Sequence, residues 1–295
     1  MNYNNHTISD KIINRFRKVA KRRLEKLRTT PVRIHNRLRL STSVSDKKHT
    51  WRYVTPTRET WIRAKTMLTK EPETIDWLDS VPIGDIFWDI GASVGCFSLY
   101  AARAREAVVV SFEPMSNTYA VLTENIHSNQ LGSQISAFCV AFSEKTTVSY
   151  LHLTSRVAGT SEHSIDPDND LAGSGRRFEL RQSSLNYTVD DFISNFNLQV
   201  PNYIKIDVDG DERKILLGAY KTLREPSLKS ILVEIDEKDS ALAQESIQTL
   251  SDANFHIQTR TALKKGPENT FFNYVFSRSS RYTVAPTCIL PPVDQ

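Results

Sequence analysis

The chain has 295 residues, of which 39% are hydrophobic and 24% charged, and this composition is ordinary for a globular protein. Its longest apolar runs, such as AVVV at 107–110, are far too short to cross a bilayer, which excludes a protein with membrane-spanning helices. Three scattered cysteines exclude a disulfide framework and a four-ligand zinc site. Because the N-terminus also lacks the apolar core of a secretory signal, we expect a cytoplasmic protein.

Charge is divided unevenly along the chain. Residues 1–40 hold twelve basic and two acidic side chains, a net charge of +10, whereas the other 255 residues hold 26 basic and 32 acidic ones, a net charge of −6. Apolar residues recur at helical spacing through residues 10–40, which predicts a basic amphipathic helix as an N-terminal extension. Such a helix can dock on its own domain, join two copies in a homo-oligomer, lie peripherally on an anionic membrane surface, or contact nucleic acid. Residues 1–50 are therefore predicted to be an arm, with the polar run at 41–49 as its linker.

The body of the chain begins with residues 51–80, whose periodicity predicts a helical cap of two helices. The main domain follows at residues 81–280, where strands and helices alternate. Its first half predicts, in order, the strand FWDIGA, the helix VGCFSLYAARA, the strand AVVVSFEP, the helix MSNTYAVLTENIHSN, the strand ISAFCVAFS and an additional strand TVSYLHL. A polar insertion at 152–186 shows no convincing period, which is typical of a functional or mobile loop.

The second half of the domain continues the alternation and ends in a tail at residues 281–295. It predicts the helix TVDDFISNF, the strand NYIKIDVDG, the helix DERKILLGAYKTL, the strand SILVEID, the helix SALAQESIQTLSDAN and the strands FHIQTR and FFNYVFS. This order predicts an α/β fold with a mostly parallel seven-stranded, Rossmann-like sheet, helices on both faces and an antiparallel pair at one edge. Ligands bind such sheets beyond the carboxyl ends of the strands, at the point where the strand order reverses.

A glycine turn follows the first strand of the main domain. In DIGASVG, Gly91 permits the sharp turn, and Gly95 is expected to let a ligand or the helix approach closely. The spacing is G-x-x-x-G, with Ser93 where a dinucleotide fold needs glycine. Asp89 would repel a pyrophosphate and attract an ammonium or sulfonium group. The turn therefore favours S-adenosylmethionine over NAD, although an NAD-linked oxidoreductase stays an alternative.

The second strand ends in Glu113, whose carboxylate can accept hydrogen bonds from both hydroxyls of a ribose. Pro114 and Met115 are expected to line one side of an adenine ring, and Ala141 and Phe142, at the end of the third strand, the other. In the alternative interpretation, Asp89 caps the following helix, Glu113 makes a surface ion pair and the apolar residues are core. The predicted cofactor-binding residues are Asp89, Gly91, Ala92, Ser93, Gly95, Glu113, Pro114, Ala141 and Phe142.

Segments of the main domain resemble a known family. They are FWDIGASVGCFSLYAA, VVVSFEPMSNTYAVLTENI, VAFSEK, YTVDDFI, YIKIDVDGDERKILLGAYKTL, ILVEID and a late NYVF, and over residues 84–277 they look like the FkbM family of class I methyltransferases. The resemblance implies S-adenosylmethionine as the methyl donor and a hydroxyl oxygen as the usual acceptor, on a sugar or glycan or on a secondary metabolite. The family more often has Glu where Asp209 stands and a small residue where Asp211 stands.

The fourth strand carries the candidate catalytic residues. Lys205, Asp207 and Asp209 alternate with apolar residues, which places them on one face of a strand. We expect Lys205 and Asp207 to form an ion pair, Asp207 to lie beside the reacting centre, and Asp209 or Lys205 to act as the base or to orient the acceptor hydroxyl. Alternatively, these groups only hold the strand-to-helix turn at Gly210.

Further candidate groups have no spacing that specifies their role. Magnesium is one hypothesis, because Asp207, Asp209 and Asp211, with Glu234 and Asp236 on the next strand, supply oxygen ligands. His163 is either a base delivered by a lid or a solvated loop residue. Motifs of nucleic-acid base methylation are absent, which weighs against nucleic acid as the acceptor. A protein that binds lipid or RNA through its arm, with weak catalysis, stays a further alternative.

Overall fold

The computed structural model describes residues 18–19, 21–23, 40–161, 163–165, 178–263 and 270–278. The chain divides into two compact units, Met1–Leu40 and Ser41–Gln295. In the first unit, the five described residues before Leu40 are helical and exposed. Residues 1–17, 20 and 24–39 of the predicted arm, residues 166–177 of the insertion and the tail at 281–295 lie outside the described residues. No helix in the described ranges is long and apolar enough to span a membrane.

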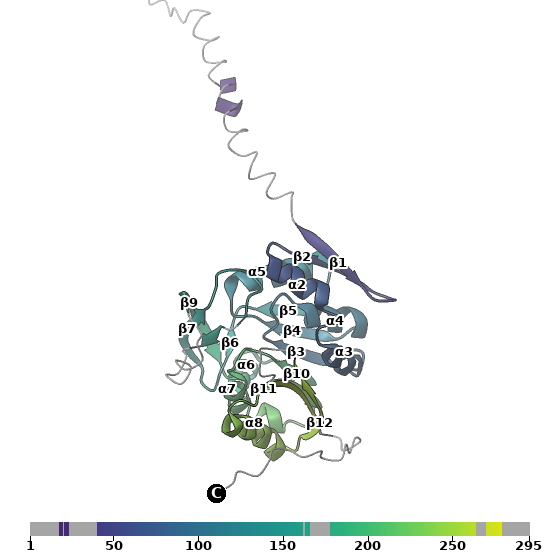
Figure 1. Ribbon diagram of the computed structural model, residues 1–295, viewed down its shortest axis with the longest axis vertical. Coiled ribbons are helices and arrows are strands. Elements are labelled where there is room, and N and C mark those ends of the chain that lie inside the picture. The colour runs from purple at the N-terminus through teal and green to yellow at the C-terminus, as the bar shows by residue number, and fades with distance from the viewer. Residues whose placement is uncertain are drawn as a thin grey trace, which may run out of the picture. The chain divides into compact units, whose positions relative to one another are not determined.

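A seven-stranded sheet forms the centre of the second unit, in the order β12-β13-β11-β10-β3-β4-β5 (Figure 1). Strands β3, β4, β5, β10 and β11 are parallel, and β13 pairs antiparallel with both β11 and β12. The predicted mostly parallel sheet with an antiparallel edge is therefore confirmed. Its strands are β3 (Ile86–Ile90), β4 (Val108–Phe112), β5 (Ile135–Phe138), β10 (Tyr203–Ile206), β11 (Ser230–Asp236), β12 (His256–Ala262) and β13 (Phe271–Ser277).

Helices cover both faces of this sheet, and alternate residues of its central strands belong to two separate apolar clusters. In β3, Phe87 packs in one cluster and Trp88 in the other. The first cluster includes residues of α2 (Arg58–Thr66), α3 (Pro72–Asp79), α4 (Cys96–Arg105) and α5 (Ser116–Ser128). The second includes residues of α6 (Val189–Phe196), α7 (Glu212–Leu217) and α8 (Ser240–Asp252).

The linker predicted at residues 41–49 is instead part of a β-hairpin. Strand β1 (Ser41–Ser45) pairs antiparallel with β2 (Thr50–Val54), and the side chain of Asp46 accepts hydrogen bonds from two backbone amides of the turn. Trp51 and Tyr53 of β2 are fully buried in the core. The fully buried aromatic anchors of the hairpin lie on β2, and β1 contributes only the partly buried Val44, so its composition resembles that of a loop. The two helices predicted within 51–80 are α2 and α3.

A second, four-stranded sheet corrects two further predictions. Its strand order is β6-β9-β7-β8, and it consists of β6 (Ala141–Phe142), β7 (Thr147–Leu153), β8 (Ser164–Ile165) and β9 (Leu180–Tyr187). The predicted third strand is thus two strands, since β5 ends at Phe138 and β6 belongs to the other sheet. The insertion contains β8 and β9, where no period was found. The inward positions of β9 are Ser184 and Asn186, and the Asn186 amide donates to Ser149 Oγ at 2.5 Å, so hydrophobic alternation is absent.

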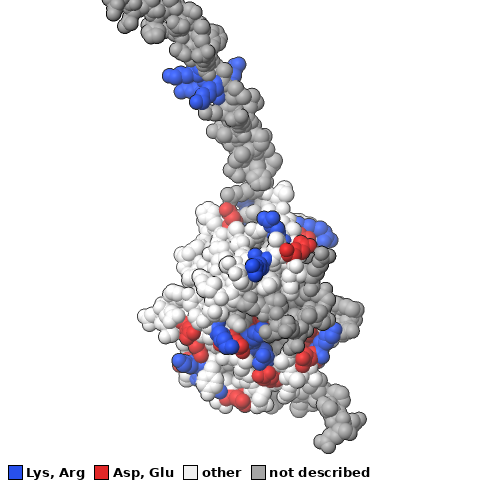
Figure 2. All heavy atoms as spheres, turned by 90° about the vertical axis from the view of Figure 1, so that its left-hand side faces the viewer, with Lys and Arg blue, Asp and Glu red and all other residues white. Residues whose placement is uncertain are grey.

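Carboxylates dominate the buried charge. Among the described residues, the buried charged side chains are one lysine, Lys205, and six carboxylates, namely Glu71, Asp89, Glu113, Asp211, Glu212 and Glu234. On the surface face drawn in Figure 2, acidic and basic side chains of the body are interspersed, without an extended patch of one sign. Part of the acidic excess of residues 41–295 therefore lies inside the protein.

Candidate active site

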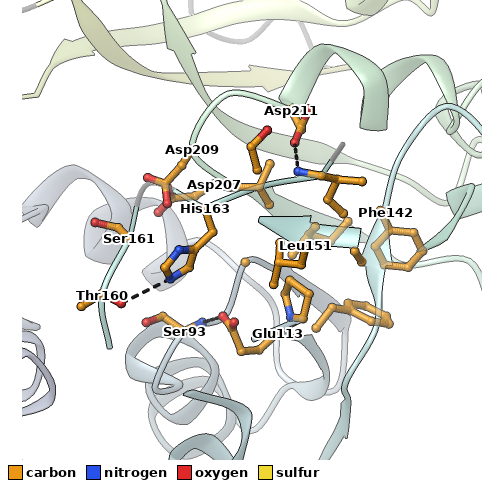
Figure 3. Close-up of a pocket in the computed structure, with 18 of the residues that line it drawn as sticks. Ser93, Glu113, Phe142, Leu151, Thr160, Ser161, His163, Asp207, Asp209 and Asp211 are labelled. Carbon is orange, nitrogen blue, oxygen red and sulfur yellow. Dashed lines mark hydrogen bonds between the residues drawn. The ribbon is translucent and has the colours of Figure 1, made fainter. Parts of the chain in front are cut away.

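A cavity of about 890 Å³, counted with its open mouth, lies at the carboxyl ends of β3, β4 and β10. The strand order reverses between β3 and β10, so this is the switch point at which doubly wound sheets bind ligands. Figure 3 shows side chains from the glycine turn, the end of β4, the insertion and the loop after β10 converging on the cavity. Its lining residues are Arg63, Lys70, Ile90, Gly91, Ser93, Phe112, Glu113, Pro114, Val140, Ala141, Phe142, Leu151, Thr160, Ser161, His163, Ser164, Ile165, Asp207, Val208, Asp209 and Asp211.

The glycine turn forms one wall of the cavity, but only Gly91 and Ser93 of its predicted residues line it. Gly91 has φ +82°, and a Cβ there would lie 1.9 Å from the carbonyl oxygen of Asp207. A Cβ at Gly95 would lie 2.5 Å from Leu122 Cδ1, so this glycine serves packing between helices rather than approach of a ligand. Ala92 is buried, and its amide donates to the carbonyl of Phe112 at 2.9 Å.

Glu113 leaves β4 as a buried carboxylate in the cavity wall. Its Oε2 accepts from the Ser93 amide and its Oε1 from the Met115 amide, both at 2.9 Å, so each oxygen keeps a lone pair for another donor. Burial raises the pKa of Glu113 to about 7, although the two backbone amides and the positive charge of Arg63 act to lower it. Ser93 Oγ is buried and has no hydrogen-bond partner among the described residues. The wall thus offers a carboxylate and a hydroxyl to the polar groups of a ligand.

The opposite side of the cavity is apolar. Pro114, Ala141 and Phe142 line it together with Ile90, Phe112, Val140, Leu151 and Ile165. The ring of Phe142 packs against Phe112, with centroids 4.7 Å apart, and against Phe192, at 5.5 Å. Its position is therefore held by the core beneath the cavity.

A buried ion pair lies behind the cavity wall. Lys205 is 1% exposed, and its Nζ lies 2.7 Å from Asp207 Oδ2, so the expected pair is present. Burial lowers the pKa of Lys205, but the carboxylates of Asp207, Asp89 and Glu71 outweigh it and raise that pKa above its ordinary value. Lys205 is therefore protonated at neutral pH and does not line the cavity. Its position contradicts the hypothesis that Lys205 acts as the base.

Asp89 also lies behind the wall rather than in it. It is opposite Lys205 in the β3–β10 register, and its Oδ2 accepts a 2.5 Å hydrogen bond from Ser98 Oγ. Burial raises its pKa, whereas Lys205 and Ser98 oppose that rise. Oδ1 has no partner in the described ranges. Asp89 is thus a buried carboxylate on the strand beside Lys205, and it is not among the residues that line the cavity, where the contact with a cationic ligand group is predicted.

Lys205→Met is expected to lower the free energy of unfolding at pH 7 by about 3–5 kcal/mol, because it leaves Asp207 and Asp89 without their cation. The loss should shrink as the pH falls, since protonation neutralises both carboxylates. Urea denaturation measures it. Lys229→Met is the matched control, because it removes the 2.6 Å ion pair between Lys229 and Asp85 at the surface, where the lysine side chain is 46% exposed. It should lower the free energy of unfolding by less than about 1 kcal/mol. Equal losses in the two variants would contradict the role of Lys205.

The loop after β10 presents carboxylates to the cavity. Strand β10 ends at Ile206, so Asp207 and Asp209 lie beyond the strand and the predicted alternation does not extend to them. Asp209 has φ +64° in the left-handed region. The buried carboxylate of Glu212 accepts hydrogen bonds from the backbone amides on either side of Asp209, those of Val208 at 3.1 Å and Gly210 at 3.2 Å. This turn directs Asp209 toward the cavity (Figure 3). Gly210 marks the turn in the sequence, but nothing there indicates that the Glu212 carboxylate holds it.

The insertion closes the cavity as an anchored wall. Arg63 Nε donates to the carbonyl of Gly159 at 2.7 Å, and Thr57 Oγ1 donates to that of Ala158 at 2.8 Å. On the other side, the amide of Ile165 in β8 donates to Asp211 Oδ2 at 3.2 Å. Residues 158–165, apart from the undescribed 162, are thus tied to α2 and to the loop after β10. Sequence spacing gave no signal for these contacts.

His163 lines this wall, with its ring beside Thr160 (Figure 3), and both of its ring nitrogens are engaged. The Thr154 amide donates to Nδ1 at 3.3 Å, which places the ring proton on Nε2. Nε2 lies 3.3 Å from Thr160 Oγ1, whose own proton goes to the carbonyl of Val157 at 2.8 Å. His163 is therefore a donor toward Thr160, an arrangement that does not suit a base carried by a lid.

The magnesium hypothesis finds no support in the described part of the chain, where no group of three His, Cys, Asp or Glu side chains could hold a metal ion. Asp207, Asp209 and Asp211 lie in the loop after β10, whereas Glu234 and Asp236 belong to β11.

Comparison with known families agrees with this site. A family model described as the methyltransferase FkbM domain matches residues 89–257, more than half of the chain. The chain belongs to the FkbM methyltransferase family. Its seven-stranded sheet is the Rossmann-like fold predicted for a class I methyltransferase. The FkbM domain contains the glycine turn, Glu113 and the loop after β10, whereas Arg63 and Lys70 precede the matched range.

Two curated relatives each match 55% of the chain. The hexuronic acid methyltransferase AglP of Haloferax volcanii is 25% identical over 169 residues, which are 55% of this chain and 62% of that protein. The 31-O-demethyl-FK506 methyltransferase FkbM of Streptomyces tacrolimicus is 24% identical over 184 residues, 55% of this chain and 69% of that protein. The crystal structure of methyltransferase FkbM from Methylobacillus flagellatus KT aligns with 16% identity and a TM-score of 0.44, over 86% of this chain and 60% of that one. The matched part of the chain thus spans between 62% and 69% of the two curated relatives.

Proposed function

We propose that this protein transfers a methyl group from S-adenosylmethionine to a hydroxyl oxygen of a sugar, glycan or secondary metabolite. The observation that carries the proposal is the cavity at the switch point of an FkbM domain, which is lined by the glycine turn and by several carboxylates. Among its described lining residues are four carboxylates, Glu113, Asp207, Asp209 and Asp211, and two cations, Arg63 and Lys70.

This lining fits S-adenosylmethionine better than a dinucleotide. A pyrophosphate would be repelled by the carboxylates, and the turn has Ser93 where a dinucleotide fold needs a second glycine. A ligand with an ammonium and a sulfonium group is attracted by the same charges. Glu113 and the unpartnered hydroxyl of Ser93 would hold the ribose, and Pro114, Ala141 and Phe142 would enclose the adenine. When bound, the cofactor supplies a methyl group that its sulfonium already activates.

The remaining chemistry belongs to the acceptor and to this chain. An alcohol must lose its proton as its oxygen attacks, and Asp209 is the carboxylate placed to accept that proton. It lines the cavity on the turn that Glu212 holds. Asp207 lies beside it, fixed by Lys205, so that the two carboxylates have separate tasks: Asp207 is held in an ion pair and Asp209 faces the acceptor.

The acceptor class is supported by the relatives and by the polar wall of the insertion. One relative is named for a hexuronic acid and the other for a demethylated FK506, which favours a hydroxyl of a sugar or of a secondary metabolite. Thr160, Ser161 and Ser164 of the insertion line the cavity and can hydrogen-bond the hydroxyls of such an acceptor.

Calorimetry with the full chain tests the proposal. S-adenosylhomocysteine, the product of the cofactor, is expected to bind with a dissociation constant in the micromolar range, whereas NAD should give no heat at about 1 mM. Absence of binding of S-adenosylhomocysteine at that concentration, or preference for NAD, would contradict the proposed function.

A further inference from the structure

We propose that Arg63 forms a carboxylate-binding subsite in the cavity, and that the carboxylate is that of the amino-acid part of S-adenosylmethionine. This inference rests on the proposed function. An acidic acceptor is the other source of the same chemistry, and the experiment below separates the two.

Arg63 is held in place rather than free to reorient. It lies on α2, half-buried, and lines the cavity. Its Nε donates to the carbonyl of Gly159 at 2.7 Å, and its backbone carbonyl accepts a 3.5 Å contact from Cys96 Sγ. The first contact holds the guanidinium against the insertion, and the second places the backbone of α2 beside the first residue of α4.

The guanidinium has no ion-pair partner among the described residues, although carboxylates are close. Glu71 pairs with Lys70 at 3.1 Å. Both oxygens of Glu113 accept backbone amides, and Arg63 acts on that carboxylate only through space. A partly desolvated cation without a counter-ion is unfavourable, and a guanidinium can bind a carboxylate through two parallel hydrogen bonds. With Nε occupied by Gly159, its two terminal nitrogens are the groups available for such a ligand.

The surroundings of Arg63 favour the cofactor as the source of the carboxylate. Cys96 begins α4 directly after the glycine turn, so Arg63 contacts the segment that would hold the cofactor. The N-terminal end of this ten-residue helix adds a favourable field for an anion. Within the described lining, the carboxylates of the cavity are suited to the sulfonium and ammonium groups, which leaves Arg63 and Lys70 for the carboxylate.

The test substitution is Arg63→Gln. The glutamine amide nitrogen stands as many bonds from Cα as Nε does, so the hydrogen bond to Gly159 is kept while the charge and the terminal nitrogens are removed. Lys65→Gln is the matched control, because it removes one positive charge from the same helix at an exposed residue outside the described cavity lining.

Calorimetry of the full chain with two ligands supplies the readout. S-adenosylhomocysteine carries the amino-acid carboxylate, and 5′-methylthioadenosine lacks the whole amino-acid group. Arg63→Gln is expected to weaken binding of S-adenosylhomocysteine on the order of 10- to 100-fold and to change that of 5′-methylthioadenosine less than about 2-fold. Lys65→Gln should leave both unchanged. An equal loss for both ligands would overturn the inference, because it would show a structural effect only.

A third titration addresses the acceptor. If Arg63→Gln binds S-adenosylhomocysteine as the wild type does, D-glucuronate and D-glucose are titrated into the enzyme saturated with that ligand. Preference of the wild type for glucuronate, lost in Arg63→Gln, supports the subsite with the acceptor as its source. No such preference overturns the subsite. If the wild type binds no S-adenosylhomocysteine, the proposed function itself is contradicted. That result differs from the two outcomes that concern only the source of the carboxylate at Arg63.

Discussion

Gly91→Ala is expected to abolish binding of S-adenosylhomocysteine and to lower the free energy of unfolding by about 2–5 kcal/mol. The added Cβ would lie 1.9 Å from the carbonyl oxygen of Asp207, and alanine is strained at φ +82°. The glycine turn and the loop after β10 must therefore move apart, which displaces Asp207 and Asp209 from the cavity. Urea denaturation and calorimetry measure the two effects.

Gly84→Ala separates the steric effect from the backbone strain. Gly84 has nearly the same φ, +81°, but a Cβ there would meet no atom within 4 Å. We expect this control to cost about 1 kcal/mol and to bind S-adenosylhomocysteine as the wild type does. Similar losses in both variants would mean that the contact between Gly91 and Asp207 is not what forms the site.

Glu113→Gln is expected to weaken binding of S-adenosylhomocysteine on the order of 10- to 100-fold at pH 8 and to make it independent of pH between 6 and 8. Burial raises the pKa of Glu113 to about 7. Above that pH the carboxylate is charged and can accept from two ribose hydroxyls. Below it, a proton must leave before the ligand binds, so wild-type affinity should fall as the pH falls, by up to about tenfold per unit.

Calorimetry at several pH values measures both profiles. Glu106→Gln is the control, because Glu106 is exposed at the end of α4 and should leave the profile unchanged. A wild-type affinity that does not vary between pH 6 and 8, or that rises as the pH falls, would show that Glu113 is not a ligand-binding carboxylate in its charged form.

The part of the site on strand ends was predictable from sequence. Gly91, Ser93, Glu113, Pro114, Ala141 and Phe142 were identified from their positions after buried strands, and all of them line the cavity. Alternation identifies the face of a strand but not the depth of a side chain along it. For this reason Lys205 and Asp89 were assigned to the cavity, although both are buried behind its wall.

The rest of the site depends on contacts between distant segments. Arg63 and Gly159 are 96 residues apart, and no local period links them. Strand β9 gives no hydrophobic signal because its buried positions are Ser184 and Asn186, and the Asn186 amide hydrogen-bonds Ser149 of β7. Polar burial of this kind leaves no hydrophobic pattern in the sequence.

A crystal structure of the full chain with S-adenosylhomocysteine tests the central claim most directly. We predict that the ligand fills the cavity between the glycine turn and the apolar side, with its ribose hydroxyls within hydrogen-bond distance of Glu113 and its carboxylate at Arg63. A ligand bound elsewhere, or one whose ribose lies away from Glu113, would contradict the assignment of this cavity as the cofactor site.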